Sequence, residues 1–234
     1  AAGKGTRMES DLPKVLHPVD GKPMLHHVIQ LAESIGSKKI VPIIGYQHER
    51  VEKSMQEFNL NCVVQEDQLG TGHAVMQSEH LLGSFDGTIL VLSGDVPLLR
   101  KSSIQLLLDM YEKENAGAAL LTASMDDPTG YGRIIRNESN HFAKIVEHKD
   151  CIEEELNVNE INAGIYLFDA QLLFKSLRMI KNDNSQNEYY LPDLMMILVE
   201  HGYKIVPKIL KNQDELININ TQVDLLLANR VRRF

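Results

Sequence analysis

The sequence predicts an α/β fold of Rossmann-like type, with a mixed, mainly parallel sheet, helices on both faces and a small β-rich insertion. The chain has 234 residues, 43% of them hydrophobic, which is enough to bury a core. Short apolar runs alternate with helical patterns as far as about residue 125, and turn residues with short strands follow. We expect one domain over 1–234, with a first half to about 125, a second half over about 126–220 and a C-terminal helix at 221–234.

The first half is expected to begin with a helix that packs on a sheet, followed by two strands. Apolar residues at helical spacing predict a helix over 23–35. Strands are expected at 39–44 and 61–65, on either side of a polar helix over 47–58. Pro42 cannot donate to a strand ladder, so it belongs at an edge or a bulge.

The most apolar strand of this half is predicted at 88–92, after a helix over 72–82. An uninterrupted apolar run suits a parallel strand that is buried on both faces. Ligand groups in open α/β sheets lie at the carboxyl ends of such strands, so Asp95 is a candidate site residue. A helix over 102–115 and a strand over 118–124 complete the half.

The second half contains turn residues and short strands before its helices. In order, the sequence predicts a hairpin of 133–136 with 142–147, a strand at 160–168, a helix capped by Asp169 and ending near 179, a helix over 192–201, a strand at 204–208 and a closing helix capped by Thr221.

The charge and cysteine content exclude several classes of protein. The net charge of -8 arises from 32 acidic and 24 basic residues without a long run of either sign, so we expect no nucleic-acid or membrane partner. No apolar stretch approaches the ~20 residues that span a bilayer. Cys62 and Cys151 are too few for a disulfide framework, which fits a reducing cytoplasm.

The first fourteen residues carry the chemistry that binds anions. Gly3 and Gly5 allow close backbone approach, and Lys4, Arg7 and Lys14 are cations that suit a nucleoside triphosphate. No third glycine completes a dinucleotide fingerprint, and no Gly-Lys-Ser/Thr completes a Walker A loop. A flexible basic tail is the alternative that local sequence leaves open.

Several ordered motifs match a known family. They are AAGKGTRM at 1–8, LPK at 12–14, QEDQLGTGHA at 65–74, GDVPL at 94–98, DPTGYGRI at 127–134, IVEHKD at 145–150 and EIN at 160–162. Together they resemble the uridylyltransferase domain of the bacterial GlmU family, the N-acetylglucosamine-1-phosphate uridylyltransferases. The glycine-rich motif alone indicates only a sugar nucleotidyltransferase, whereas several ordered motifs are far more specific.

The resemblance implies a reaction and a cofactor. The uridylyl group of UTP would pass to N-acetylglucosamine 1-phosphate, giving pyrophosphate and UDP-N-acetylglucosamine, a precursor of the cell wall, with Mg²⁺ as cofactor. Such transfer depends on positioning and charge neutralisation rather than on a covalent nucleophile. The first half would then bind the nucleotide and the second half the sugar.

The resemblance also implies roles for the phosphate segment, residues 1–14. The backbone at Ala1, Ala2 and Gly3 would lie along the nucleotide. Arg7 would neutralise the leaving β- and γ-phosphates, and Lys14 would bind the α-phosphate or the incoming sugar phosphate.

The resemblance implies that the base and the metal would be bound by residues of other motifs and by Asn220. Gln65, Gly70 and Thr71 match positions that read uracil and ribose. Asp95 and Asn220 match magnesium ligands, and phosphate oxygens with waters would complete the octahedron. Each of these last two residues could instead serve only in a turn.

Gly132, Glu147 and Asn162 match positions that hold the hydroxyls and acetamido group of the sugar. On local sequence alone, Glu147 would be a solvated charge on a hairpin. His26 and His27 are adjacent and would point apart on a helix, so we expect no histidine metal site.

Three alternatives remain at this point. The chain could transfer a nucleotide to another sugar, such as glucose 1-phosphate, or bind nucleotide sugars without turnover; a Rossmann oxidoreductase is disfavoured because the third glycine is missing. No hexapeptide repeats occur before Phe234, so we expect uridylyl transfer without the acetyltransferase β-helix domain. Members of the family trimerise through that domain, and a monomer or weak oligomer is expected here.

Overall fold

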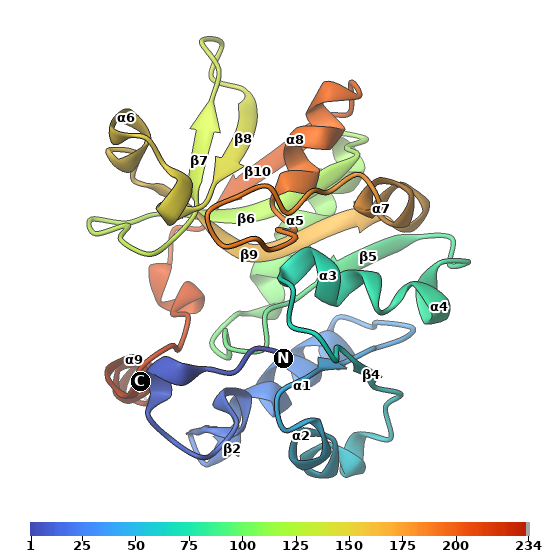
Figure 1. Cartoon of the computed structure of the whole chain (residues 1–234), viewed down its shortest axis with the longest axis vertical. Helices are drawn as coiled ribbons and strands as arrows, with labels where there is room; N and C mark the ends of the chain where they lie inside the picture. The colour runs from blue at the N-terminus through green and yellow to red at the C-terminus, as the bar shows by residue number, and fades with distance from the viewer. Residues whose placement is uncertain (233–234) are drawn as a thin grey trace. The chain divides into compact units, whose positions relative to one another are not determined.

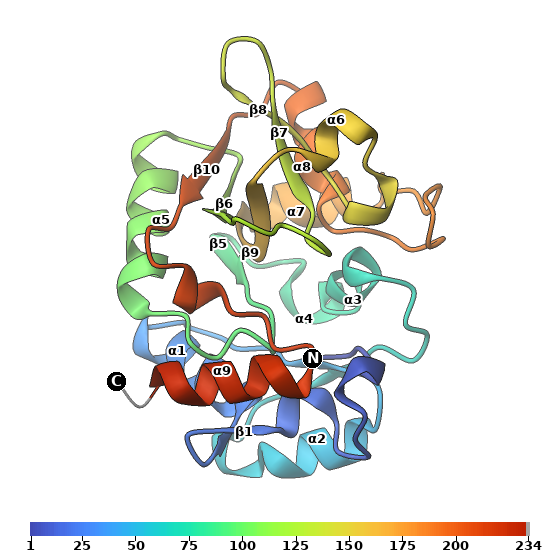
Figure 2. The same cartoon turned by 90° about the vertical axis from the view of Figure 1, so that its left-hand side faces the viewer.

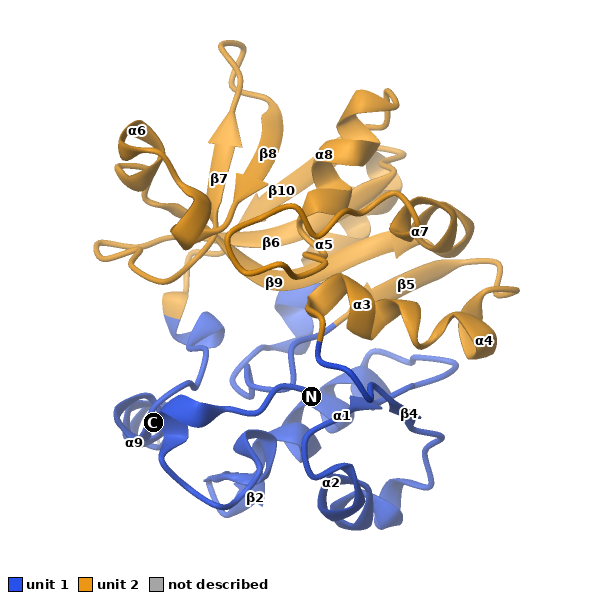
Figure 3. Ribbon diagram, in the orientation of Figure 1, with its two compact units in different colours: residues 1–68, 92–104, 214–234 blue, residues 69–91, 105–213 orange. Residues whose placement is uncertain are grey.

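A computed structural model describes residues 1–232, which form two compact units (Figure 3). Unit 1 consists of Ala1–Gln68, Leu92–Ile104 and Asp214–Phe234, and unit 2 of Leu69–Val91 and Gln105–Gln213. Unit 1 therefore combines both ends of the chain with a central segment, whereas the sequence predicted halves that meet near residue 125. That the chain is a single domain stays a prediction.

The largest sheet lies in unit 2 and has six strands (Figure 1). Its order is β10-β6-β9-β7-β8, with β5 also paired to β9. The strands are β5 (Thr88–Val91), β6 (Ala118–Ser124), β7 (Arg133–Arg136), β8 (Phe142–Val146), β9 (Glu160–Asp169) and β10 (Ile205–Ile209). The pair β10–β6 is parallel, and the remaining pairs are antiparallel.

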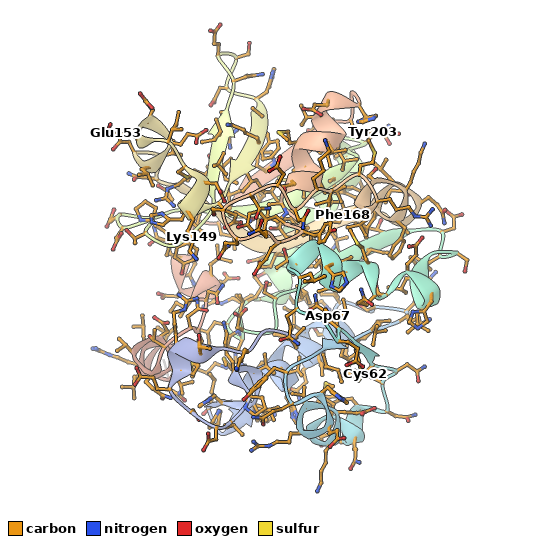
Figure 4. All side chains as sticks on the ribbon, in the orientation of Figure 1. Cys62, Asp67, Lys149, Glu153, Phe168 and Tyr203 are labelled. Carbon is orange, nitrogen blue, oxygen red and sulfur yellow. The ribbon has the colours of Figure 1, made fainter. Side chains whose placement is uncertain are left out.

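Helices lie on both faces of this sheet. In Figures 1 and 2 the unit 2 part of α5 (Lys101–Lys113) lies on one face, and α7 (Ala170–Leu177) with α8 (Asp193–Glu200) lies on the other. Asp169 caps α7 as predicted, since its carboxylate accepts a 2.8 Å hydrogen bond from the Leu172 amide. Phe168, labelled in Figure 4, is fully buried in β9. The mixed α/β, Rossmann-like fold class is confirmed.

Two predictions about strand direction were wrong. The 88–92 run forms β5, which pairs antiparallel with β9 and is at most half-buried, so it is not a parallel strand buried on both faces. The sheet is mixed but not mainly parallel. An apolar run indicates burial and carries no information about direction, which depends on where the chain returns.

Shorter helices connect these strands. The predicted helix over 72–82 is divided at Gln77 and Ser78, giving α3 (Thr71–Met76) and α4 (Glu79–Leu82). The hairpin is followed by the 3-10 helix η4 (His148–Asp150) and by α6 (Glu153–Leu156).

Unit 1 is built from helices and two small sheets. Its helices are α1 (Met24–Ser34), α2 (His48–Ser54) and α9 (Gln222–Arg232), with the 3-10 helices η1 (Thr6–Met8), η2 (Lys14–Leu16), η3 (Gln56–Phe58) and η5 (Gln213–Leu216, beginning in unit 2). The strands β1 (Pro18–Val19) and β2 (Lys22–Pro23) are antiparallel, and β3 (Ile43–Ile44) and β4 (Val63–Val64) are parallel.

The strands expected at 39–44 and 61–65 are reduced to β3 and β4. Pro42 lies immediately before β3, where its carbonyl accepts a 2.9 Å hydrogen bond from the Val63 amide. Its missing N–H explains why the ladder begins only after it.

The core of unit 1 joins segments that are distant in sequence. Met8, Met24 and Ile219 are fully buried in one apolar cluster with Val19, Leu98 and Ala228. Packing Met8 against Ile219 places their polar neighbours Arg7 and Asn220 close together. Within residues 1–232, no helix is long and apolar enough to cross a membrane.

Candidate active site

The phosphate segment is folded around Gly5. Gly5 has a left-handed backbone with φ of 61°, and Met8 closes the turn by donating to the Gly5 carbonyl at 3.0 Å. A Cβ on Gly5 would lie 2.5 Å from the Lys14 Cβ. Glycine is therefore required twice here, for its conformation and for the close passage of the Lys14 side chain.

The residues before Gly5 pack against the end of β3. The Ala2 carbonyl accepts a 3.0 Å hydrogen bond from the Tyr46 amide, and a Cβ on Gly45 would lie only 2.8 Å from that carbonyl. At Gly3, by contrast, a Cβ would meet nothing within 4 Å. The backbone at Gly3 is thus open to a ligand, which is what its predicted role requires.

Lys14 lies at the centre of a polar cluster in unit 1. Its ammonium is 2.5 Å from Asp95 Oδ2 and 2.6 Å from Asn220 Oδ1. Arg7 donates to the same Asn220 oxygen at 3.0 Å. Four residues singled out from separate parts of the sequence therefore share one network, and the side chains of Lys14 and Asp95 are 14% and 17% exposed.

The backbone fixes Asn220 next to Asp95. The amide of buried Ile219 donates to the Asp95 carbonyl at 3.0 Å. The Asp224 carboxylate accepts from the amides of Asn220 at 2.9 Å and Thr221 at 2.8 Å, while Thr221 Oγ1 accepts from the Asp224 amide at 3.2 Å. Thr221 thus caps α9 as predicted, in a reciprocal capping box.

The same two oxygens suit a divalent cation. Asp95 Oδ2 and Asn220 Oδ1 both approach one ammonium nitrogen, so they converge on a position that already accommodates positive charge. One carboxylate and one amide oxygen are hard ligands of the kind Mg²⁺ takes when phosphates and waters supply the rest. Among residues 1–232, no group of three or more His, Cys, Asp or Glu side chains could hold a metal by itself.

A second cluster lies in unit 2, at the start of the β7–β8 hairpin. The Asn162 amide donates to the Gly132 carbonyl at 2.8 Å, and a Cβ on Gly132 would lie 3.1 Å from Glu147 Oε1. The Asn162 side chain donates to the Tyr166 hydroxyl at 2.7 Å, which fixes its amide. The three residues predicted to hold the sugar therefore lie beside one another.

Glu147 is not the solvated charge that local sequence suggested. Burial, followed by the nearby carboxylates of Asp193, Asp150 and Glu188, raises the pKa of Glu147 to about 7. Burial, followed by Asp150, raises the pKa of Asp193 to about 6. Carboxyl groups with raised pKa values are common at functional sites, although structural clusters also produce them.

Gly70 and Thr71 are fixed by the segment of unit 2 that precedes α8. Gly70 has φ of 108°, and a Cβ there would lie 2.7 Å from the Tyr189 carbonyl. Thr71 Oγ1 accepts a 3.0 Å hydrogen bond from the Leu191 amide. The side chain of Thr71 therefore has a structural partner in the Leu191 amide.

Gln65 belongs to unit 1, where it follows β4. Its amide donates to the Ile44 carbonyl at 2.7 Å, and its side chain is buried. Two hollows of unit 1, about 360 and 320 Å³, share Asn59 and Leu60 and are lined by none of the predicted site residues.

Comparison with known proteins decides the family. The family model described as nucleotidyl transferase matches residues 1–213. The chain belongs to the nucleotidyl transferase family. It is 44% identical over its whole length to the bifunctional protein GlmU of Bacillus mycoides and to that of Bacillus cereus. It spans about half the length of these curated relatives, 52% in both cases.

Solved structures show the same nucleotidyl transferase fold. A UDP-glucose pyrophosphorylase in complex with UDP-glucose has a TM-score of 0.77 at 19% identity, covering 100% of this chain and 96% of that one. A Bacillus anthracis protein assigned as a glucose-1-phosphate thymidylyltransferase, in complex with sucrose, has a TM-score of 0.75 at 21% identity, covering 100% and 93%. At these identities the likeness concerns the fold alone.

Some residues of this nucleotidyl transferase that shape the clusters were not found from sequence. Asp224 holds the backbone of Asn220, Asn218 accepts from the Asn220 side chain at 3.1 Å, and Tyr166 holds Asn162. The T-x-x-D spacing of Thr221 and Asp224 is a capping-box signal that could have identified Asp224. Nothing in the local sequence marks Tyr166.

Proposed function

We propose that this chain transfers a uridylyl group from UTP to N-acetylglucosamine 1-phosphate, releasing pyrophosphate. The observation that carries the proposal is the Lys14 ammonium, 2.5 Å from Asp95 and 2.6 Å from Asn220, with Arg7 on the same amide oxygen. Two cations beside two oxygen ligands form a site for phosphate and metal. The resemblance of the motifs to GlmU and the 44% identity to two GlmU proteins support N-acetylglucosamine as the sugar.

The cations neutralise the charge that accumulates during transfer. When an oxygen of the sugar phosphate attacks the α-phosphorus and pyrophosphate leaves, the phosphates of both substrates come together. Arg7 stabilises the departing pyrophosphate, and Lys14 stabilises the α-phosphate or the incoming sugar phosphate. Prepositioned charges of this kind supply most of the catalysis in such reactions.

Asp95 and Asn220 would hold a magnesium ion. Bound there, the ion supplies further neutralisation of phosphate charge. The chain's part is to keep the two oxygens converged, which it does through the Ile219–Asp95 backbone bond and the Asp224 capping box.

Residues of unit 2 would recognise the sugar. Gly132 lacks a side chain beside the Glu147 carboxyl, which leaves space for a hydroxyl group. Glu147 would accept from that hydroxyl, and Asn162 would contact the acetamido group. Gln65, together with the backbone of Gly70 and Thr71, would bind uracil and ribose, and the backbone of Ala1, Ala2 and Gly3 would lie along the nucleotide.

Transfer to glucose 1-phosphate is the second candidate, since the structural neighbour that binds UDP-glucose has the same fold. We infer a cytoplasmic location for the chain, in keeping with its resemblance to the GlmU proteins.

The test is release of pyrophosphate from UTP and Mg²⁺ with a panel of sugar 1-phosphates. We expect release with N-acetylglucosamine 1-phosphate and its loss in Asp95→Ala, with Asp86→Ala, an exposed aspartate, as control. Binding of UDP-N-acetylglucosamine without pyrophosphate release would show a binding module instead.

A further inference from the structure

Residues 45–50, which comprise the turn after β3 and the start of α2, hold the phosphate segment at three points. The Tyr46 amide donates to the Ala2 carbonyl at 3.0 Å. The Lys4 ammonium lies 5.6 Å from the centre of the Tyr46 ring, within the range of a cation–π contact. The third contact is to the Asp11 carbonyl.

Gln47, which precedes α2, and Arg50, in its first turn, both direct their side chains at that carbonyl. Arg50 Nη1 donates to the Asp11 oxygen at 2.9 Å, and Gln47 Nε2 donates to it at 3.3 Å. The same Arg50 nitrogen donates to Gln47 Oε1 at 2.6 Å, so each donor fixes the other. We call Gln47 and Arg50 the brace.

The backbone of the brace is itself unusual. Gln47 has φ of 50°, a left-handed conformation that glutamine seldom adopts. The His48 amide closes the turn by donating to the Gly45 carbonyl at 2.9 Å. Such a conformation costs energy and persists where surrounding structure enforces it, which marks the turn as a place where position matters.

Because the Asp11 carbonyl is fixed, the backbone that leads from Asp11 to Lys14 has a restricted path. Only Leu12 and buried Pro13 lie between them, and the proline ring restricts one of those backbones. The Leu16 amide then donates to the Pro13 carbonyl at 2.8 Å, which forms the turn of η2 that begins at Lys14. Little freedom remains between the brace and the Lys14 Cα.

We propose that Gln47 and Arg50 are positioning residues that act through Lys14, holding its ammonium where phosphate binds. They contact neither Asp95 nor Asn220 and contribute through the Asp11 carbonyl. The proposal deepens the proposed function and rests on it where UTP is the probe.

The first experiment compares wild type with Gln47→Ala/Arg50→Ala. We expect faster hydrogen exchange at the amides of Leu12 and residues 14–17 and about a tenfold weaker Kd for UTP with Mg²⁺, the size of one lost charged hydrogen bond. Arg50→Lys, which retains a donor, should recover part of the loss. Arg178→Ala breaks an exposed 2.6 Å contact with Glu79 in unit 2 and should change neither measurement.

A double-mutant cycle separates positioning from general stability. In a Lys14→Met background, Gln47→Ala/Arg50→Ala should weaken UTP binding no further, because the group it positions is gone. An equal loss in both backgrounds would show that the brace acts independently of Lys14 and would overturn the proposal. Gln47→Gly/Arg50→Ala, in which glycine suits the left-handed turn, repeats the test if the alanine variant folds poorly.

The two proposals can fail separately. If wild type binds no UTP, the proposed function fails, and exchange at Leu12 and residues 14–17 still decides whether the brace orders the Lys14 turn. Unchanged hydrogen exchange in Gln47→Ala/Arg50→Ala would overturn the proposal that the brace positions Lys14, whatever the result of the UTP binding measurement.

Discussion

The Lys14 ammonium and the Asn220 amide oxygen lie 2.6 Å apart although 206 positions separate them in the sequence. Within unit 1, this contact joins a segment near the start of the chain to one near its end. Since Arg7 donates to the same oxygen, one amide carbonyl holds two of the three cations of the phosphate segment. The contact keeps Asn220, the proposed metal ligand, beside Lys14 and Arg7, the proposed phosphate ligands.

Substitution of Asn220 should separate its two roles. Asn220→Ala removes the oxygen that holds Lys14 and Arg7, and we expect the rate of pyrophosphate release to fall about 100-fold, as for loss of one preorganised group. Asn220→Asp keeps an oxygen and adds charge, so Mn²⁺ binding, followed by electron paramagnetic resonance, should tighten. Asn61→Ala, an exposed asparagine, is the control. Normal activity in Asn220→Ala would contradict the assignment.

The two glycines of the phosphate segment should respond differently to alanine. Gly5→Ala forces a left-handed alanine and a contact 2.5 Å from Lys14, so we expect a loss of at least about 1–2 kcal/mol and a fall in Tm of about 2–8 °C. Gly3→Ala meets no atom within 4 Å and should leave Tm unchanged while raising KM for UTP. Calorimetry and kinetics on both variants check this contrast, and equal Tm values would refute it.

Stability should fall as pH rises through the range set by Glu147. Its pKa is about 7 in the folded protein, against 4.5 as the ordinary value. Between these values the folded state keeps a proton that the unfolded state has lost, so the free energy of unfolding decreases with increasing pH. Asp193, with a pKa of about 6, has the same sign.

Glu147→Gln should therefore flatten the dependence of Tm on pH between 4.5 and 7. We expect the variant to be more stable than wild type at about pH 8 by about 1–3 kcal/mol, since glutamine at position 147 cannot become charged. Glu138→Gln, exposed on the same hairpin, is the control. Parallel Tm curves for Glu147→Gln and wild type would contradict the raised pKa.

Loss of the capping box should loosen the metal ligand. Asp224→Ala removes the acceptor for the Asn220 and Thr221 amides, and losing such a cap costs about 0.5–2 kcal/mol. We expect a lower Tm. We also expect the rate of pyrophosphate release to rise less steeply with Mg²⁺ when the Mg²⁺ concentration is low. A change in Tm without any change in the Mg²⁺ response would show that the box only stabilises α9.

The sequence predicted the elements more reliably than their pairing. The limits of β6 match the prediction, and Asp169 and Thr221 cap the helices they were expected to cap, because these signals are local. The direction of β5 was missed because it depends on the return of β9 from a distant part of the chain.

In the candidate site, too, local signals were predicted and features that depend on tertiary packing were missed. Motifs identified Lys14 and Asp95, the family resemblance added Asn220, and the structure brings the three into one network. The brace of Gln47 and Arg50 was not found, because it acts on a backbone carbonyl through side chains that carry no motif. The burial of Glu147 also depends on tertiary packing that no local pattern reports.

The most direct test of the proposed reaction is a competition in one tube. The purified chain receives UTP, Mg²⁺ and equal amounts of N-acetylglucosamine 1-phosphate and glucose 1-phosphate, and mass spectrometry measures the two UDP-sugars at low conversion. We predict that UDP-N-acetylglucosamine dominates. A majority of UDP-glucose, or the formation of neither product, would contradict the proposed uridylyl transfer to N-acetylglucosamine 1-phosphate.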